Sequence, residues 1–88
     1  MKKSSGGKKH ELATLDLHGH RMEGLEDSVD RFITQSQKKG QDSVRIMTGK
    51  GSGQVKTAVQ KYLKMGGYPF HFERGLGGVN EGVLIVSI

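Results

Sequence analysis

The sequence predicts a small α/β domain with two layers, a sheet and a pair of helices packed on one of its faces. Segments with the two-residue period of strands alternate with two segments of helical period, in the order strand, helix, strand, helix, strand, strand. Eighty-eight residues hold one domain of about this content. Two successive strand–helix units imply parallel strands joined by right-handed crossovers, which place both helices on the same face.

The first unit is expected to contain a strand at residues 12–17, where apolar and polar side chains alternate. A helix follows at residues 22–39, with acidic residues at its start and lysines at its end, as the helix dipole favours. Gly24 should weaken its first turn, and Gly40 is placed as its C-terminal cap. Its apolar residues recur at helical spacing: Met22, Leu25, Val29, Phe32 and Ile33.

The second unit begins with a strand at residues 43–47, whose Val44 and Ile46 should point inward. A glycine-rich loop at residues 48–53 leads into a helix at residues 54–65, which a Gly-Gly pair ends. The apolar stripe of this helix consists of Val55, Ala58, Val59, Tyr62 and Leu63.

Two more strands close the chain. The strand at residues 68–73 contains Pro69, which has no N–H for a ladder, so we expect it at an edge. The strand at residues 83–88 is the most continuously apolar segment and should be central and buried on both sides. The glycines between them, at residues 75–82, predict a flexible hairpin loop.

The net charge of +5 is concentrated at the start of the chain, because four of the lysines lie in residues 1–10. Residues 11–88 carry ten basic and nine acidic side chains and are nearly neutral. We therefore divide the chain into a disordered basic arm at residues 1–10, able to touch phosphates loosely, and a domain at residues 11–88. The alternative for the arm is a solvated leader without function.

The composition excludes several classes of protein. The chain has no cysteine, which rules out disulfide scaffolds and thiolate zinc sites and fits a cytoplasmic location. The longest apolar run, residues 83–86, is far shorter than the ~20 residues of a membrane span, so no membrane partner is expected.

The glycine-rich loop TGKGSG follows a strand and opens a helix, which is the setting in which backbone N–H groups bind an anion. It is neither a Walker A loop nor a dinucleotide fingerprint, because the required Ser or Thr after Lys50 and the third glycine at position 54 are missing. A phosphate or a nucleic-acid backbone is the expected ligand. The alternative is a tight turn whose glycines serve geometry alone.

The motif DLHG places Asp16 and His18 on the same face at the end of the first strand. Because the two parallel strands end at one edge, this motif and the glycine loop should be neighbours in space. A carboxylate beside an imidazole can support proton transfer. Alternatively, Asp16 is buried and holds the glycine loop, and His18 is an ordinary polar residue. The sequence indicates no metal site, because the other histidines lie in separate elements.

Two motifs together resemble the small MutS-related domain, known as Smr: LDLHG at residues 15–19 and VRIMTGKGSG at residues 44–53, with AVQKYL and GVLIVSI in the expected order. The resemblance extends over residues 12–88. It implies a two-layer sandwich like the C-terminal domain of translation initiation factor three, with a mixed four-stranded sheet. Members of the family are described as endonucleases or nucleic-acid binders. They stand alone or at the C-terminus of a MutS-like protein, and act in DNA processing or on the messenger RNA of stalled ribosomes.

The resemblance also implies roles for particular residues. Asp16 and His18 match the Asp and His of the family, and Gly49, Lys50 and Gly51 match its second glycine motif. Thr48 stands where many bacterial members have His and other members have Thr. If that His is a proton donor in some members, this protein would need another. Arg21, at the expected start of the first helix, is a poor capping residue.

We therefore expect a nucleic-acid endonuclease module that nicks DNA or cleaves RNA, with Asp16 and His18 as catalytic residues. Phosphate or nucleic-acid contacts are expected from Gly19, Arg45, Thr48, Gly49, Lys50, Gly51, Ser52, Gly53, Lys56 and Arg74. The rival hypothesis is a non-catalytic module that binds nucleic acid or the ribosome within a larger DNA-repair or ribosome-rescue protein.

The sequence leaves the cofactor open. No metal ligands are indicated, although attack by water on DNA would favour a divalent metal such as Mg or Mn. The expected partners are DNA or RNA and the ribosome. We expect a monomer, or a weak dimer formed through the open face of the sheet.

Overall fold

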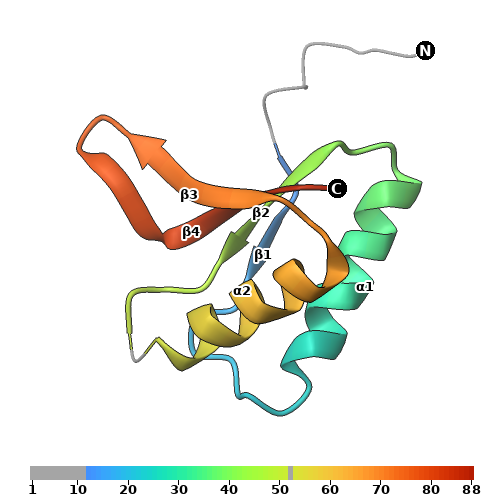
Figure 1. Cartoon of the computed structure of the whole chain (residues 1–88), viewed down its shortest axis with the longest axis horizontal. Helices are drawn as coiled ribbons and strands as arrows, with labels where there is room; N and C mark the ends of the chain where they lie inside the picture. Colours follow the sequence, from blue (N-terminus) through green and yellow to red (C-terminus); the bar gives the residue numbers. More distant parts are fainter. Residues whose placement is uncertain (1–11, 52) are drawn as a thin grey trace.

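The computed structural model describes residues 12–51 and 53–88, so the arm expected at residues 1–10 lies outside the described residues. Its elements follow the predicted order (Figure 1). They are β1 (Thr14–Asp16), α1 (Leu25–Lys38), β2 (Ser43–Met47), α2 (Gln54–Gly66), β3 (Phe70–Gly75) and β4 (Gly78–Ser87).

The four strands form one mixed sheet in the order β1-β2-β4-β3. β1 and β2 are parallel, whereas β4 pairs antiparallel with β2 on one side and with β3 on the other. The predictions of a central last strand and of a third strand at the edge are therefore confirmed. Pro69 lies just before the edge strand, and its carbonyl accepts a hydrogen bond from the Ser87 N–H at 2.8 Å.

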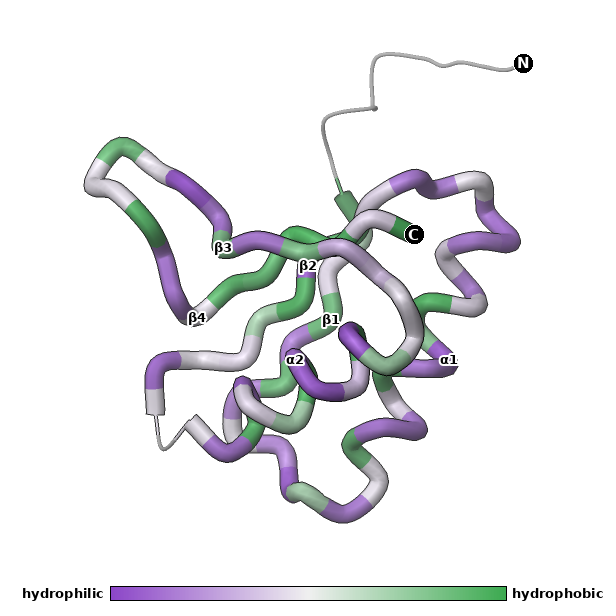
Figure 2. The backbone as a smooth tube through the Cα atoms, in the orientation of Figure 1, coloured by the Kyte–Doolittle hydropathy of each residue, from purple (hydrophilic) through white to green (hydrophobic). Residues whose placement is uncertain are grey.

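The core lies between one face of the sheet and the two helices. Val44 and Ile46 of β2 are opposite Val86 and Leu84 of β4, and all four side chains are fully buried. The apolar segments of the two central strands stand out in Figure 2. The helices contribute Leu25, Val29, Ile33, Val59 and Leu63 to the same cluster, and Leu17 completes it. Both helices therefore cover one face, as predicted.

The other face of the sheet is open, and this changes the environment expected for β4. Ile85 is only half-buried and Ser87 is exposed, so β4 is not buried on both sides. The prediction of two-sided burial was wrong because neither helix reaches this face. An ion pair crosses it: the Arg45 guanidinium donates to both carboxylate oxygens of Glu73, at 2.7 and 2.8 Å.

Helix α1 begins three residues later than predicted. Gly24 adopts a left-handed backbone with φ of +77° and forms the N-cap, so Met22 and Glu23 precede the helix. The apolar spacing of Met22 suggested a helical residue, but this side chain is 48% exposed. The far end agrees with the prediction: Gly40 is left-handed and the Gln41 N–H donates to the Ser36 carbonyl at 3.0 Å, as in a Schellman motif. Neither of these helices has the length and hydropathy needed to cross a bilayer.

The glycine cluster at residues 75–82 is not the flexible loop that was predicted. β3 extends through Gly75 and β4 begins at Gly78, so only Leu76 and Gly77 lie between the strands. The sequence did not predict strand here because glycine has no side chain, so a glycine-rich segment cannot show the alternation of apolar and polar residues that marks a strand. The pairing is interrupted once, between Phe72, opposite Leu84, and the following residue.

Strand order predicts a pattern of amide hydrogen exchange. We expect slow exchange throughout residues 84–86 of β4, because these residues pair with β2 on one side and with β3 on the other. In β3, alternate amides face away from the sheet and should exchange rapidly. Exchange followed by NMR in native buffer would measure both, and equal protection along both strands would contradict this strand order.

Candidate functional site

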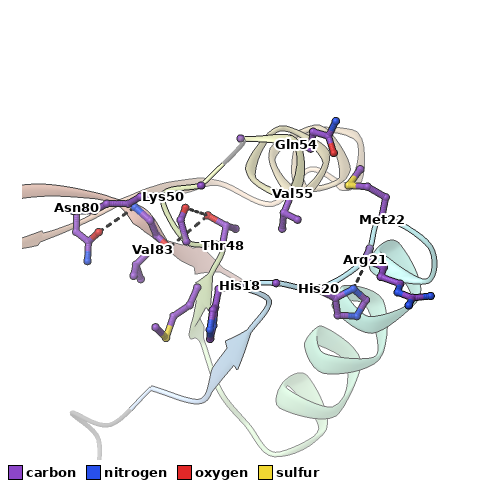
Figure 3. A pocket seen from close by; sticks show the side chains of 16 residues that line it. His18, His20, Arg21, Met22, Thr48, Lys50, Gln54, Val55, Asn80 and Val83 are labelled. Atoms are coloured by element: carbon purple, nitrogen blue, oxygen red, sulfur yellow. Dashed lines mark hydrogen bonds between the residues drawn. The ribbon is translucent and has the colours of Figure 1, made fainter.

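A cleft of about 910 Å³ opens where β1 and β2 end and α2 begins (Figure 3). The loop after β1 contributes His18 and Gly19, and the loop after β2 contributes Thr48, Gly49, Lys50, Gly51 and Gly53. The structure thus confirms that the two loops are neighbours. The cause is the parallel register of β1 and β2, in which Asp16 is opposite Met47 at the last pair.

Asp16 and His18 form a close pair at the end of β1. His18 Nδ1 lies 2.6 Å from Asp16 Oδ1, and the same oxygen accepts the His18 backbone N–H at 3.1 Å. The hydrogen bond from His18 lowers the pKa of the Asp16 carboxyl, and the carboxylate raises the pKa of His18. An ionised carboxylate can only accept, so Nδ1 carries the proton and Nε2 is directed elsewhere. The His18 side chain is 71% exposed and the Asp16 side chain is 49% exposed. Asp16 is therefore not the buried residue that the alternative interpretation required to hold the glycine loop.

The glycine loop packs directly against this pair. A Cβ at Gly49 would lie 3.1 Å from the His18 Cβ, and the backbone of Gly49 has φ of +80°. Both the space and the conformation therefore require glycine at this position. Gly51 differs: its φ is not in the left-handed region, and a Cβ there would meet no atom within 4 Å. Nothing within the described part of the fold explains a glycine at position 51.

The loop is held from its other side by Gly82, which the sequence did not indicate. The Gly82 carbonyl accepts the N–H groups of Thr48 and Gly49 at 2.8 and 3.1 Å. The buried Thr48 hydroxyl lies 3.4 Å from the same oxygen. A Cβ at Gly82 would lie 3.3 Å from the Gly49 carbonyl carbon. Two N–H groups that were expected to bind an anion thus bind the protein instead.

An irregularity in the β3–β4 pairing allows this contact. Phe72 is opposite Leu84, but the next residue, Glu73, is opposite Asn80. The intervening residues of β4 therefore bulge away from the ladder, and the Asn80 side chain accepts the Gly82 N–H at 3.0 Å. Such bulges are common beside active sites because they redirect the chain. No composition or periodicity signal could have shown it.

The cleft is free of acidic side chains among the residues that line it, and it carries cations. Lys50 and Arg21 line it together with His18 and His20. His20 is engaged at both ring nitrogens: Nδ1 lies 2.5 Å from the Arg21 carbonyl and Nε2 lies 3.3 Å from Ser28 Oγ. His18 is consequently the imidazole of the cleft with a ring nitrogen available to a ligand. Arg21, His20, Asn80 and Gly82 were not predicted as site residues; they reach the cleft only through the fold.

Three predicted phosphate contacts lie outside the cleft. Arg45 is on the open face of the sheet, where the Glu73 carboxylate raises its pKa and the guanidinium lowers that of Glu73. Arg74 is on β3, opposite Val79. Lys56 is near the loop, but its Nζ lies 3.6 Å from Glu81 Oε1 and 5.6 Å from the centre of the Phe72 ring. Ser52 lies outside the described residues.

The described side chains do not form a ready metal centre. Within residues 12–51 and 53–88, no three His, Asp or Glu side chains are grouped closely enough to hold an ion. The pair of Asp16 and His18 would supply two ligands at most. A divalent metal such as Mg or Mn would therefore need further ligands from a bound phosphate or from water.

Comparison with known proteins places this arrangement in a family. The family model described as "Smr domain" matches residues 15–88. "Endonuclease MutS2" of Ligilactobacillus salivarius is 39% identical over 69 residues, which are 78% of this chain and 9% of that protein. "Endonuclease MutS2" of Acetivibrio thermocellus is 33% identical over 75 residues, which are 84% of this chain and 10% of that protein. The chain thus spans a tenth or less of the length of these relatives.

Two solved structures share the fold. The crystal structure of the Smr domain of Thermus thermophilus MutS2 has a TM-score of 0.77 at 23% identity, covering 86% of this chain and 96% of that one. The solution structure of the SMR domain of NEDD4-binding protein 2 has a TM-score of 0.59 at 23% identity, covering 96% and 91%. The family match over residues 15–88, on a fold whose two motif loops meet in one cleft, shows that this chain belongs to the Smr domain family.

Proposed function

We propose that this domain is a nucleic-acid endonuclease module that cleaves the phosphodiester backbone of DNA. The observation that carries the proposal is the cleft itself: His18, which is hydrogen-bonded to Asp16, and Lys50 of the glycine loop line one space, and no carboxylate is among the described residues that line it. A polyanion can enter such a cleft without repulsion. The relatives named "Endonuclease MutS2" support the same class of reaction.

The phosphate would bind at Lys50, Gly51 and the start of α2, beyond the N–H groups of Thr48 and Gly49 that donate to the Gly82 carbonyl. Lys50 has no carboxylate within ion-pair distance among the described residues, so its ammonium can neutralise a phosphate oxygen. At Gly51 neither the backbone conformation nor a neighbouring atom of the described residues requires glycine. The absence of a side chain there fits a position where a phosphate approaches the backbone closely. The N-terminus of α2, which starts at Gln54, adds its positive dipole end.

His18 would act as the general base. Asp16 fixes the tautomer with the proton on Nδ1, which leaves Nε2 to take the proton of the attacking group. The attacking group is water on DNA, or the 2′-hydroxyl if the substrate is RNA. Attack forms a bond from that oxygen to phosphorus, the bond to the leaving oxygen breaks with its electron pair on that oxygen, and the leaving oxygen takes a proton from solvent water. Lys50 stabilises the charge that develops on the phosphate.

One observation favours a second candidate, a module that binds nucleic acid or the ribosome without cleaving. Thr48, which stands where many family members have His, is buried and its hydroxyl lies 3.4 Å from the carbonyl oxygens of Gly49 and Gly82. It therefore offers no proton to a leaving group. In this case the cleft would position the ligand, and another part of a larger protein would act on it.

Removal of the His–Asp pair tests cleavage directly. We expect His18→Ala and Asp16→Asn each to lower the cleavage rate by about 100-fold or more, with binding changed only a few-fold. The double variant should lose little more than either single variant, because the two side chains act as one unit. Rates would be measured on labelled DNA and RNA, with and without a chelator.

These variants should fold, since both side chains are substantially exposed. Retained cleavage in both folded variants would remove the pair from the mechanism. Absence of cleavage by the wild type on either substrate, with binding intact, would establish the binding module instead.

The pH dependence of cleavage provides a separate test of the role of His18. A general base acts when deprotonated, so the rate should rise with pH through the raised pKa of His18. Asp16→Asn replaces the carboxylate with a neutral amide, which weakens the hydrogen bond and removes the charge that raise the pKa of His18. The rising limb should then move to lower pH while the maximal rate falls. Single-turnover rates across the neutral range would show the shift. If the rising limb of the pH–rate profile stays at the same pH in Asp16→Asn, a group other than His18 controls the rate.

Binding by the glycine loop is tested with a matched pair of lysines. Lys50→Ala should weaken binding to DNA of every sequence and reduce the slope of log K against log salt by about one. Lys39→Ala removes the same charge from the exposed far end of α1 and should leave both unchanged. Fluorescence anisotropy at several salt concentrations measures the slope. Equal effects of the two variants would mean that the loop contributes only overall charge.

A further inference from the structure

The β3–β4 hairpin has a distal half that projects away from the body of the domain (Figure 1). Beyond the bulge, Glu73, Arg74 and Gly75 pair with Asn80, Val79 and Gly78 as a narrow two-stranded ribbon. At its tip, Leu76 is 111% exposed. Glycines surround Leu76 on both sides, so it is the one large side chain of the tip. A fully exposed leucine at the tip of a narrow ribbon can reach into a groove or between stacked bases that the body of the domain would be too wide to enter.

The ribbon begins at the rim of the cleft. Asn80 and Gly82 both line the cleft, and the Gly82 carbonyl holds the glycine loop. Gly78 lies four positions before Gly82 in β4, which is at most about 13 Å at the rise of an extended strand. A nucleic acid that extends from the cleft along this edge would meet the ribbon within a few nucleotides.

The electrostatics of the ribbon favour a polyanion over an acidic or neutral protein surface. Residues 74–80 contain one cation, Arg74, and no carboxylate. The two flanking carboxylates are already paired, Glu73 with Arg45 and Glu81 with Lys56. Val79, opposite Arg74, is 55% exposed and extends the apolar surface. The ribbon thus presents apolar side chains with a positive flank beside a cationic cleft.

We propose that this distal hairpin is a second DNA contact, in which Leu76 inserts against the bases as a wedge while the cleft holds the backbone. The inference rests on the proposed function, because it needs DNA in the cleft. Phosphate contacts position a protein on DNA, whereas apolar side chains inserted at a base step unstack it and bend the duplex. The hairpin would therefore select sites that are easily unstacked, such as mismatches, gaps and flexible steps.

The test uses duplex DNA with 2-aminopurine placed at successive positions, whose fluorescence rises when that base is unstacked. Wild-type protein should increase the fluorescence at one or two adjacent positions. Leu76→Ser should abolish the increase and weaken binding by about tenfold, as expected for loss of a buried leucine, and leave the salt dependence unchanged. Leu76→Met should retain most of both effects. Met65→Ser, at a 79% exposed methionine near the end of α2, is the matched control and should behave as wild type.

The outcomes separate the two proposals. Binding that depends on Lys50 but not on Leu76, with no fluorescence change at any position, overturns the hairpin contact and leaves the cleft. Equal effects of Leu76→Ser and Met65→Ser also overturn it. Absence of DNA binding by the wild type overturns both the hairpin contact and the proposed function. Loss of the fluorescence change in Leu76→Ser, together with weaker binding by Lys50→Ala, supports the hairpin contact and DNA binding in the cleft, while cleavage is tested by the His18 and Asp16 variants.

Discussion

The parallel pairing of β1 and β2 is the constraint on which the rest of this structure depends. A parallel pair cannot be joined by a tight turn, so the chain must cross over through α1, and the right-handed crossover places that helix on the face that α2 also covers. The pairing continues one step past β1, where the Leu17 N–H donates to the Met47 carbonyl at 2.7 Å. This last bond fixes the points at which both loops leave the sheet. The His–Asp pair and the glycine loop meet because of it.

The central strand supplies the second support of the cleft. By bulging away from β3, β4 directs the Gly82 carbonyl at the start of the glycine loop, where it accepts two backbone N–H groups. The loop is consequently fixed between β4 and His18, and only its later residues remain to contact a ligand. The same bulge divides the hairpin into a half that belongs to the core sheet and a half that projects. One irregularity therefore shapes both proposed contacts with nucleic acid.

The distribution of charge shows why net charge alone is a poor guide to the binding surface. Arg45 and Lys56 are paired with Glu73 and Glu81, and Arg31 is paired with Asp27 on α1. These cations are paired with carboxylates of the domain itself, whereas Lys50 and Arg21 line the cleft. The nearly neutral domain can still present a cationic cleft, because its carboxylates lie elsewhere. Only cations that line the cleft and are not paired with a carboxylate are placed to bind a phosphate there.

The sequence by itself determined the order of the elements, the strand at residues 43–47, the end of α1 at Gly40 and the meeting of the two motif loops. These follow from local periodicity, from glycine at helix ends and from the fixed hand of the crossover, which are properties that short segments carry. Only the tertiary structure decided the late start of α1 at Gly24, the strand that runs through the second glycine cluster, and the place of Arg45 on the open face. The second glycine cluster becomes a strand because it pairs with a neighbouring strand, and Arg45 is held on the open face by the carboxylate of Glu73. The start of α1 follows the left-handed backbone of Gly24. Pairing across the sheet, and not the preference of any single segment, settles where such residues lie.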